Sequence, residues 1–227
     1  MKEASMYRHQ RRIALPVGAI TLALSLSACS IGLTSDSASS AKSASTGNSH
    51  SATQGGEIPA GWKKVTAKTA GISLAVPEDW AGLGDDVDEE TATANLEQIA
   101  NEEALSKIVS EQRTGSDILY ITPGPATSSF EMIEVSSDLE SAEKITSIET
   151  LKETLPSTSR ELARNIEEID TPLGKGYVFD AEIEGLKFKD LYVPNNKGQF
   201  VEVLFLALDE DTVTQRYEAV LKTLSVE

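Results

Sequence analysis

The segment from Phe200 to Leu208 is apolar at every position except Glu202, and this limits the possible folds more than any other stretch of the chain. Side chains alternate between the two faces of a strand, so the apolar residues fall on both faces. One face would carry Val201, Val203, Phe205 and Ala207, and the other Phe200, Leu204, Leu206 and Leu208. A strand with two apolar faces must be covered on both sides, which predicts a central strand in a layered fold.

The residues before this strand predict its neighbours. Tyr177 to Ile183 alternates apolar and polar side chains, and after a turn at Gly185 the alternation resumes with Lys187 and Lys189 on the polar face. Pairing across that turn would set the two lysines beside the acidic side chains of the preceding strand. Pro194–Gly198 then predicts a hairpin loop that leads into the central strand.

Helices are predicted where apolar residues recur at helical spacing. Asp209 predicts the N-cap of a final helix. Ser147 predicts the cap of an earlier helix, which Pro156 should kink or split, with Leu162 and Ile166 continuing its apolar face.

A third helical region is predicted from about residue 88 to Arg113, after an acidic stretch at residues 85–90 that suits a helix N-terminus. Apolar runs predict four more strands at Trp62–Ala67, Gly71–Pro77, Ile118–Thr122 and Phe130–Val135. The total is about seven strands and three or four helices, joined mostly by short turns. This pattern favours an α+β fold, with a mainly antiparallel sheet and helices packed on it.

The N-terminus has the pattern of an export signal. Residues 1–12 are cationic, residues 13–28 are apolar, and Leu26-Ser27-Ala28-Cys29 resembles the bacterial lipobox. In that motif the cysteine thiol takes a diacylglyceryl group and cleavage follows before the cysteine. Cys29 is the only cysteine, so it is the predicted lipidation site and no intramolecular disulfide is possible. Two alternatives stay open: a plain signal peptide with a chance cysteine, and twin-arginine export through Arg11-Arg12.

Residues 30–57 contain nine serines and no aromatic residue, so they cannot bury enough apolar surface to fold alone. We expect a lipoprotein signal peptide at 1–28, the lipidated Cys29 with a flexible tether at 29–57, and a globular domain at 58–227. The tether would span roughly 30 Å as a coil. Its serines and threonines could alternatively accept O-glycans.

The charge balance excludes nucleic acid as a partner. Removing the four basic and one acidic residues of the signal from totals of 20 and 36 leaves 16 and 35, a net charge of −19. Such a surface repels phosphates and anionic headgroups. The acidity favours solubility outside the cell, and the alternative is a basic partner or a divalent cation.

The predicted domain lacks the usual catalytic side chains, because the two histidines, His9 and His50, precede it and Cys29 does too. Imidazole and thiol chemistry and typical zinc sites are thereby excluded. We therefore expect no catalytic residue, no metal and no cofactor. Some alternatives remain: a carboxylate pair or a calcium site within residues 85–90, a Ser-Lys dyad, and ligand stacking on Trp62 or Trp80 instead of a core role.

Two stretches resemble PsbP-like domains, which include LpqN-type actinobacterial lipoproteins. Gly61-Trp62 and Gly71–Trp80 (GISLAVPEDW) are similar to the start of the family, and the apolar strand and closing helix up to Leu224 are similar to its end. The chain departs from the family in the helical region at 88–113. The family has no shared catalytic residues, and the resemblance implies a PsbP-like fold and an extracytoplasmic binding or assembly module.

These observations favour a lipid-anchored protein on the extracytoplasmic face of the cell membrane, with a non-catalytic role in binding an envelope protein or an amphiphilic ligand. The alternative is a carboxylate-based hydrolase of envelope glycans, which needs two carboxylates converging in a cleft and a perturbed pKa. An apolar groove would favour a lipid-like ligand, and a polar surface a protein partner.

The lipidation hypothesis predicts that Cys29→Ala abolishes membrane association, because two or three acyl chains anchor a protein firmly and none remain in the variant. The measurement is cell fractionation with salt and carbonate washes. A Cys29→Ala protein that stays in the washed membranes would contradict the predicted anchor.

Overall fold

The computed structural model describes residues 56–99, 115–123, 129–137, 145–183 and 185–227, together with the single residues 109, 113 and 139. The predicted signal, Cys29 and all of the tether before residue 56 lie outside these residues. The lipidation site and the boundaries at 1–28, 29–57 and 58–227 therefore stay predictions. In the described ranges, no helix is long and apolar enough to cross a membrane.

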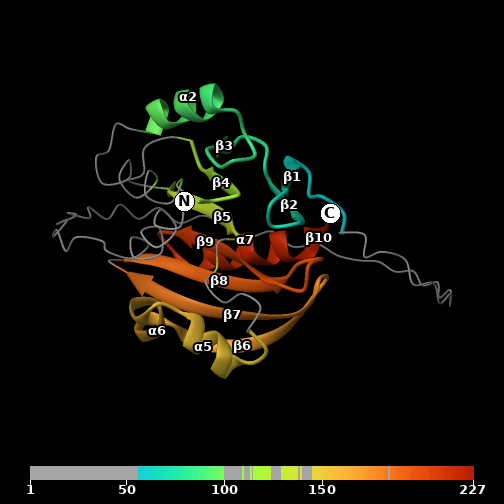
Figure 1. Ribbon diagram of the computed structural model, residues 1–227. Helices are drawn as coiled ribbons and strands as arrows, with labels where there is room; N and C mark the ends of the chain where they lie inside the picture. Colours follow the sequence, from blue (N-terminus) through green and yellow to red (C-terminus); the bar gives the residue numbers. More distant parts are fainter. Residues whose placement is uncertain are drawn as a thin grey trace, which may run out of the picture. The chain divides into compact units, whose positions relative to one another are not determined.

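The described residues form ten strands and four helices (Figure 1). The first part of the domain contains β1 (Trp62–Ala67), β2 (Ile72–Pro77), β3 (Ala81–Gly82), α2 (Glu89–Ile99), β4 (Ile118–Ile121) and β5 (Glu131–Ser136). The second part contains α5 (Ile148–Thr154), α6 (Ser157–Leu162), β6 (Arg164–Thr171), β7 (Gly174–Ile183), β8 (Leu186–Pro194), β9 (Phe200–Ala207), α7 (Glu210–Thr223) and β10 (Ser225–Val226).

The strands form two sheets. The larger has seven strands in the order β3-β4-β5-β9-β8-β7-β6, and the smaller has three in the order β1-β2-β10. Every neighbouring pair in the two sheets is antiparallel. The predicted α+β class with a mainly antiparallel sheet and packed helices is confirmed.

β9 is the central strand, as its two apolar faces predict. It pairs with β5 on one side and β8 on the other. One face contributes to the main apolar cluster through Val201, Val203, Phe205 and Ala207. Leu204 and Leu206 pack in a second cluster on the opposite face. The prediction is wrong for Leu208, which is 40% exposed because it lies beyond the end of the strand.

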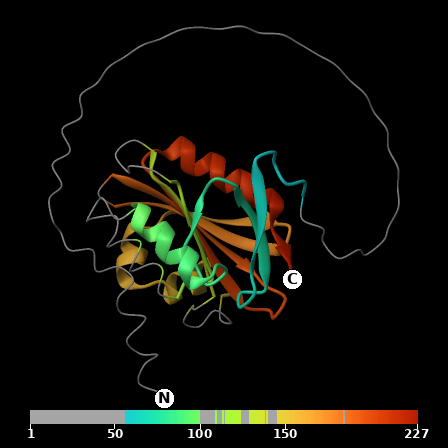
Figure 2. The same cartoon turned by 90° about the horizontal axis from the view of Figure 1, so that it is seen from above.

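Three apolar clusters hold the layers together, and Figure 2 shows α7 and α2 on opposite sides of the large sheet. The main cluster joins the large sheet to α7 and the small sheet, through residues that include Ile72, Leu74, Val203, Phe205 and Val220. The second cluster includes Leu83, Leu119, Ile121, Met132 and Leu206, with Leu96 of α2 packed against it. The third includes Leu151, Leu155, Tyr177, Phe179 and Tyr192.

The segment around Pro156 follows the prediction in its first half only. Ser147 caps α5 by accepting a hydrogen bond from Thr150 N, and Pro156 separates α5 from α6 as predicted. The prediction that the apolar face of a helix continues through Ile166 is wrong, because this residue lies in β6. The register of β6 against β7 shifts by one residue between Arg164 and Glu167, as in a β-bulge. The apolar residues Ile166 and Ile169 of this edge strand are three positions apart, which is also a helical spacing.

The hairpin of β7 and β8 confirms the predicted pairing of lysines with carboxylates. Glu182 lies opposite Lys187 and Asp180 lies opposite Lys189. Both pairs form salt bridges, with 2.7 Å between Lys187 Nζ and Glu182 Oε2. The predicted helical region at 88–113 begins as expected with α2, whereas most of it after Ile99 lies outside the described residues.

The guanidinium group of Arg216 on α7 contacts residues of both sheets, and we call this set of contacts the Arg216 clasp. Arg216 of α7 donates through Nε and Nη2 to the carboxylate of Glu131 on β5, and the distance from Nη2 is 3.2 Å. Its guanidinium carbon lies 5.6 Å from the ring centroid of Trp62 and 5.4 Å from that of Trp80. Trp80 is buried and Trp62 packs against the main cluster, so the core role predicted for both tryptophans is confirmed.

The clasp predicts that Arg216→Ala lowers the free energy of unfolding by about 2 kcal/mol, because Glu131 would keep a largely buried carboxylate without its cationic partner. The measurement is urea unfolding followed by tryptophan fluorescence. Lys222→Ala on the same helix is the control, and a loss no larger than in that control would contradict the role of the clasp.

Candidate functional site

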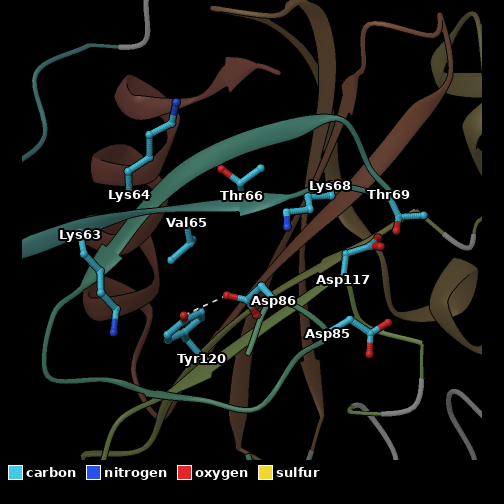
Figure 3. Close-up of a pocket in the computed structure, with 10 residues that line it drawn as sticks. All are labelled: Lys63, Lys64, Val65, Thr66, Lys68, Thr69, Asp85, Asp86, Asp117 and Tyr120. Atoms are coloured by element: carbon cyan, nitrogen blue, oxygen red, sulfur yellow. Dashed lines mark hydrogen bonds between the residues drawn. The ribbon is translucent and has the colours of Figure 1, made fainter. Parts of the chain in front are cut away.

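A groove runs along β1, where the small sheet faces the loop before α2 and the start of β4. The volume of this groove is about 490 Å³. Figure 3 shows the residues that line it: Lys63, Lys64, Val65, Thr66, Lys68, Thr69, Asp85, Asp86, Asp117 and Tyr120. We call this site the β1 groove.

One wall of the β1 groove is β1 itself, and its lysines point in different directions because strand side chains alternate (Figure 3). Lys63 Nζ lies 4.9 Å from the centroid of the Tyr120 ring and donates to the carbonyl of Glu78 at 3.3 Å. Lys64 Nζ lies on the other face, 3.1 Å from Oε1 of Glu227. Lys68 follows the end of β1 and is exposed.

The opposite wall is the loop between β3 and α2, which lies directly on β4. Leu83 N donates to Leu119 O at 2.7 Å, and Asp85 N donates to Ser116 O at 3.3 Å. A Cβ atom on Gly84 would lie 2.5 Å from Leu119 N, so only glycine permits this approach. The glycine therefore sets where Asp85 and Asp86 lie.

Asp86 and Tyr120 form the polar pair at the centre of the groove. Tyr120 Oη donates to Asp86 Oδ2 at 2.9 Å. Burial raises the pKa of Asp86, although the hydrogen bond from Tyr120 opposes that shift. Burial, together with the charge of Asp86, raises the pKa of the Tyr120 hydroxyl. Tyr120 is thus a hydrogen-bond donor that stays protonated across physiological pH.

Asp117 is a largely buried carboxylate at the edge of the groove, with an exposed fraction of 8%. Its Oδ2 atom accepts a hydrogen bond from Ser137 N at 2.7 Å. Asp117 comes just before β4, so the large sheet holds it in place. The sequence did not mark Asp117, Tyr120 or the lysines of β1 as site residues, because only the tertiary fold brings together the segments 63–69, 85–86 and 117–120.

The residues of the acidic stretch at 85–90 make different contacts and do not form a single site. Asp85 and Asp86 line the groove, whereas Asp88 accepts hydrogen bonds from Thr91 N at 2.9 Å and from Thr91 Oγ1 at 2.8 Å, as a helix cap does. Glu89 pairs with Arg113 Nη2 at 2.5 Å. Within the described ranges, no group of three or more carboxylate, imidazole or thiol ligands is arranged to hold a metal ion.

A second polar cluster is buried in the large sheet, on the face opposite the main apolar cluster. It contains the buried side chains of Glu134 and Ser136 on β5 and of Asp190 and Tyr192 on β8, together with the half-buried Glu202 of β9. Tyr192 Oη lies 3.3 Å from Asp190 Oδ2 and 3.2 Å from Glu202 Oε1. Asp190 Oδ1 and Ser136 Oγ are buried without a hydrogen-bond partner.

Burial raises the pKa of Asp190 well above its usual value, and the neighbouring carboxylate of Glu202 raises it further. Burial, followed by the charge of Asp190, also raises the pKa of Tyr192. Folding therefore favours the neutral form of Asp190 relative to the unfolded chain, because burial penalises the charged carboxylate and Glu202 repels it. This cluster was not predicted from the sequence, since only the pairing of β5 with β9 brings Glu134 and Ser136 beside the hairpin of β8 and β9.

Comparisons with known proteins leave the family open. No protein-family model matches the chain. No curated protein matches it either. Among solved structures, it is similar to the Ran-binding protein Mog1p of Saccharomyces cerevisiae, with 11% identity over 70% of this chain and 84% of that chain and a TM-score of 0.33. At this similarity Mog1p indicates neither a family nor a function for this chain, and the resemblance to PsbP-like domains stays a prediction.

The buried cluster predicts that stability falls as the pH rises. An aspartate in an unfolded chain has a pKa of about 3.9, and the folded value is higher, so the folded state binds the extra proton between the two values. The contribution of Asp190 to the free energy of unfolding is complete below about pH 4 and is lost as the pH rises through the pKa of Asp190 in the folded state. Asp190→Asn should remove this decline and raise the free energy of unfolding at neutral pH.

The measurement is urea unfolding at a series of pH values, with the exposed Glu78→Gln variant as the control for surface charge. A pH dependence that Asp190→Asn shares with the parent protein would show that the Asp190 carboxyl does not cause it.

Proposed function

We propose that the chain is an exported lipoprotein, anchored through Cys29 to the extracytoplasmic face of the cell membrane, and that its folded domain binds a polar partner in the β1 groove without catalysing a reaction. The anchor rests on the cationic and apolar segments at 1–28 and on the lipobox-like sequence that ends at Cys29. The tether at 29–57 would let the groove sample a volume beside the membrane.

The lining of the β1 groove is the observation that carries this proposal. Three lysines and three aspartates line it, and Val65 is the single aliphatic side chain among its lining residues. A lipid-like ligand needs a mostly apolar cavity, whereas polar and charged side chains suit a peptide or another polar partner. Of the two ligand classes expected from the sequence, the groove therefore favours the protein partner.

The residue types of the domain support a binding role over catalysis. Residues 58–227 contain neither histidine nor cysteine, so the groove has no imidazole base and no thiol nucleophile. The lysines have structural contacts, since Lys63 lies over the Tyr120 ring and Lys64 pairs with Glu227. These groups can position a ligand by charge and hydrogen bonding.

One observation favours the alternative, a carboxylate-based hydrolase of envelope glycans. Burial raises the pKa of Asp86, and Asp85 and Asp117 line the same groove. A carboxyl group with a raised pKa can act as a general acid when a second carboxylate lies across the scissile bond. In this alternative, Asp86 would be the acid.

The binding role predicts site-specific cross-linking in intact cells. Photoreactive benzoylphenylalanine at the exposed Thr69 position, inside the groove, should give a discrete cross-linked product with an envelope component. The same group at Glu161, which is exposed on α6 and does not line the groove, is the matched control. Asp85→Lys should reduce the Thr69 product by reversing one charge of the lining. Mass spectrometry identifies the partner.

Identical products from Thr69 and Glu161, or no product from Thr69, would contradict binding in the groove. The purified protein should release no reducing ends from isolated envelope glycan. Release that is abolished by Asp86→Asn would instead establish the hydrolase.

A further inference from the structure

We propose that the occupant of the β1 groove is an extended segment of a partner protein, which pairs with β1 as an added strand and places basic side chains at alternate positions toward Asp85, Asp86 and Asp117. This inference rests on the proposed function, because it names the class of partner for the same groove. Addition of a strand to a free sheet edge is a common mode of peptide recognition, in which backbone hydrogen bonds give affinity and alternate side chains give specificity.

The pairing of β1 with β2 shows which backbone groups are used inside the small sheet. Glu78 N donates to Gly61 O at 2.9 Å, and the register continues with Lys63 opposite Val76. In an antiparallel pair, every second residue exchanges hydrogen bonds with its partner strand. The residues of β1 at odd-numbered positions therefore bond to β2.

The even-numbered residues Lys64 and Thr66 consequently direct their backbone N–H and C=O groups away from β2, along the free edge. The opposite strand confirms this alternation, because Ala75, which lies opposite Lys64, donates its N–H outward to Thr223 Oγ1 at 3.0 Å. Ser73, opposite Thr66, likewise pairs outward with β10. No described residue supplies a hydrogen-bond partner to the outward groups of Lys64 and Thr66.

The other sheet edges in the described residues are protected, and β1 differs from them. β3 and β10 are two residues long, and β6 carries a β-bulge between Arg164 and Glu167. Short edge strands and bulges both prevent the addition of a further strand. β1 pairs over six residues without a bulge, and the groove lies along its free edge.

Edge lysines can themselves serve as protection against strand addition, so their contacts decide between the two interpretations. Lys63 is drawn over the Tyr120 ring, and Lys64 is drawn to Glu227. Lys68 lies after the last residue of β1. The lysine side chains thus leave the edge at Lys64 and Thr66 accessible.

The chemistry of the opposite wall identifies the side chains that fit. An added strand would direct every second side chain toward the wall that carries Asp85, Asp86 and Asp117. Basic side chains complement these carboxylates, and the domain as a whole is acidic, which would speed the approach of a cationic segment. Six residues of β1 span about 20 Å, enough for an added segment of similar length.

The experiment uses the full lipidated protein in non-ionic detergent and the fluorescent, end-blocked peptide Val-Lys-Val-Lys-Val-Lys-Val as the probe. Binding is followed by fluorescence anisotropy. Lys64→Pro removes the outward N–H without breaking a hydrogen bond to β2, and Lys64→Ala is the matched control that keeps this N–H. Lys64→Pro should weaken probe binding about tenfold relative to Lys64→Ala, which corresponds to about one backbone hydrogen bond.

Two further peptides test the added strand on the parent protein, so that the result does not depend on whether Lys64→Pro folds. A probe with N-methyl groups on alternate backbone amides should lose binding, and one with glutamate in place of lysine should bind at least about tenfold more weakly. Equal affinities for Lys64→Pro and Lys64→Ala, or undiminished binding of the N-methylated probe, would overturn the added strand.

Failure of this inference can be distinguished from failure of the proposed function. If the lysine probe does not bind while Thr69 still gives its specific cross-link, the groove has a partner that is not an added strand. If the protein is a dimer that Lys64→Pro converts to a monomer, the occupant of the edge is a second copy of the chain, and the proposed partner is wrong.

Discussion

The fold depends on the burial of β9 on both faces. A strand with apolar side chains in both directions is stable only when two layers cover its sheet. On one face the cover is α7 together with the small sheet, and on the other it is α2 and the two short helices α5 and α6. The Arg216 clasp strengthens the first layer, since one guanidinium contacts Trp62, Trp80 and Glu131, which belong to the small sheet, the loop after it and the large sheet.

The β1 groove is a consequence of that layered arrangement. The small sheet covers the large one without hydrogen bonding to it, and Val65 of β1 and Tyr120 of β4 belong to the same apolar cluster. The edge of β1 is therefore held next to the large sheet while its outward backbone groups are not part of a ladder. Gly84 lets the loop before α2 lie against β4, which brings its aspartates to the opposite wall. The polar groove thus borders the main apolar cluster, to which Val65 and Tyr120 of its lining belong.

The two polar sites of the domain differ in their access to solvent. The groove is open and its charges have opposite signs on facing walls, which suits a binding role. The cluster around Asp190 is buried, and this burial, followed by the charge of Glu202, raises the pKa of the Asp190 carboxyl. Buried polar groups of this kind lower stability unless they are fully paired, and Asp190 Oδ1 and Ser136 Oγ are not. We therefore expect Asp190 of the large sheet to make the stability of the fold depend on pH.

Local chemistry in the sequence determined the caps at Ser147 and Asp209, the break at Pro156, most of the strands and the central place of β9, because each depends on residues close together in the chain. Three strands were not predicted from the sequence. β6 has a register shift that leaves its apolar residues at helical spacing, and β3 and β10 are only two residues long, too short to show an alternation. Tertiary structure alone decided the β1 groove and the Asp190 cluster. Their side chains come from segments that only sheet pairing and layer packing bring into contact, and no pattern within a short stretch of sequence predicts these contacts.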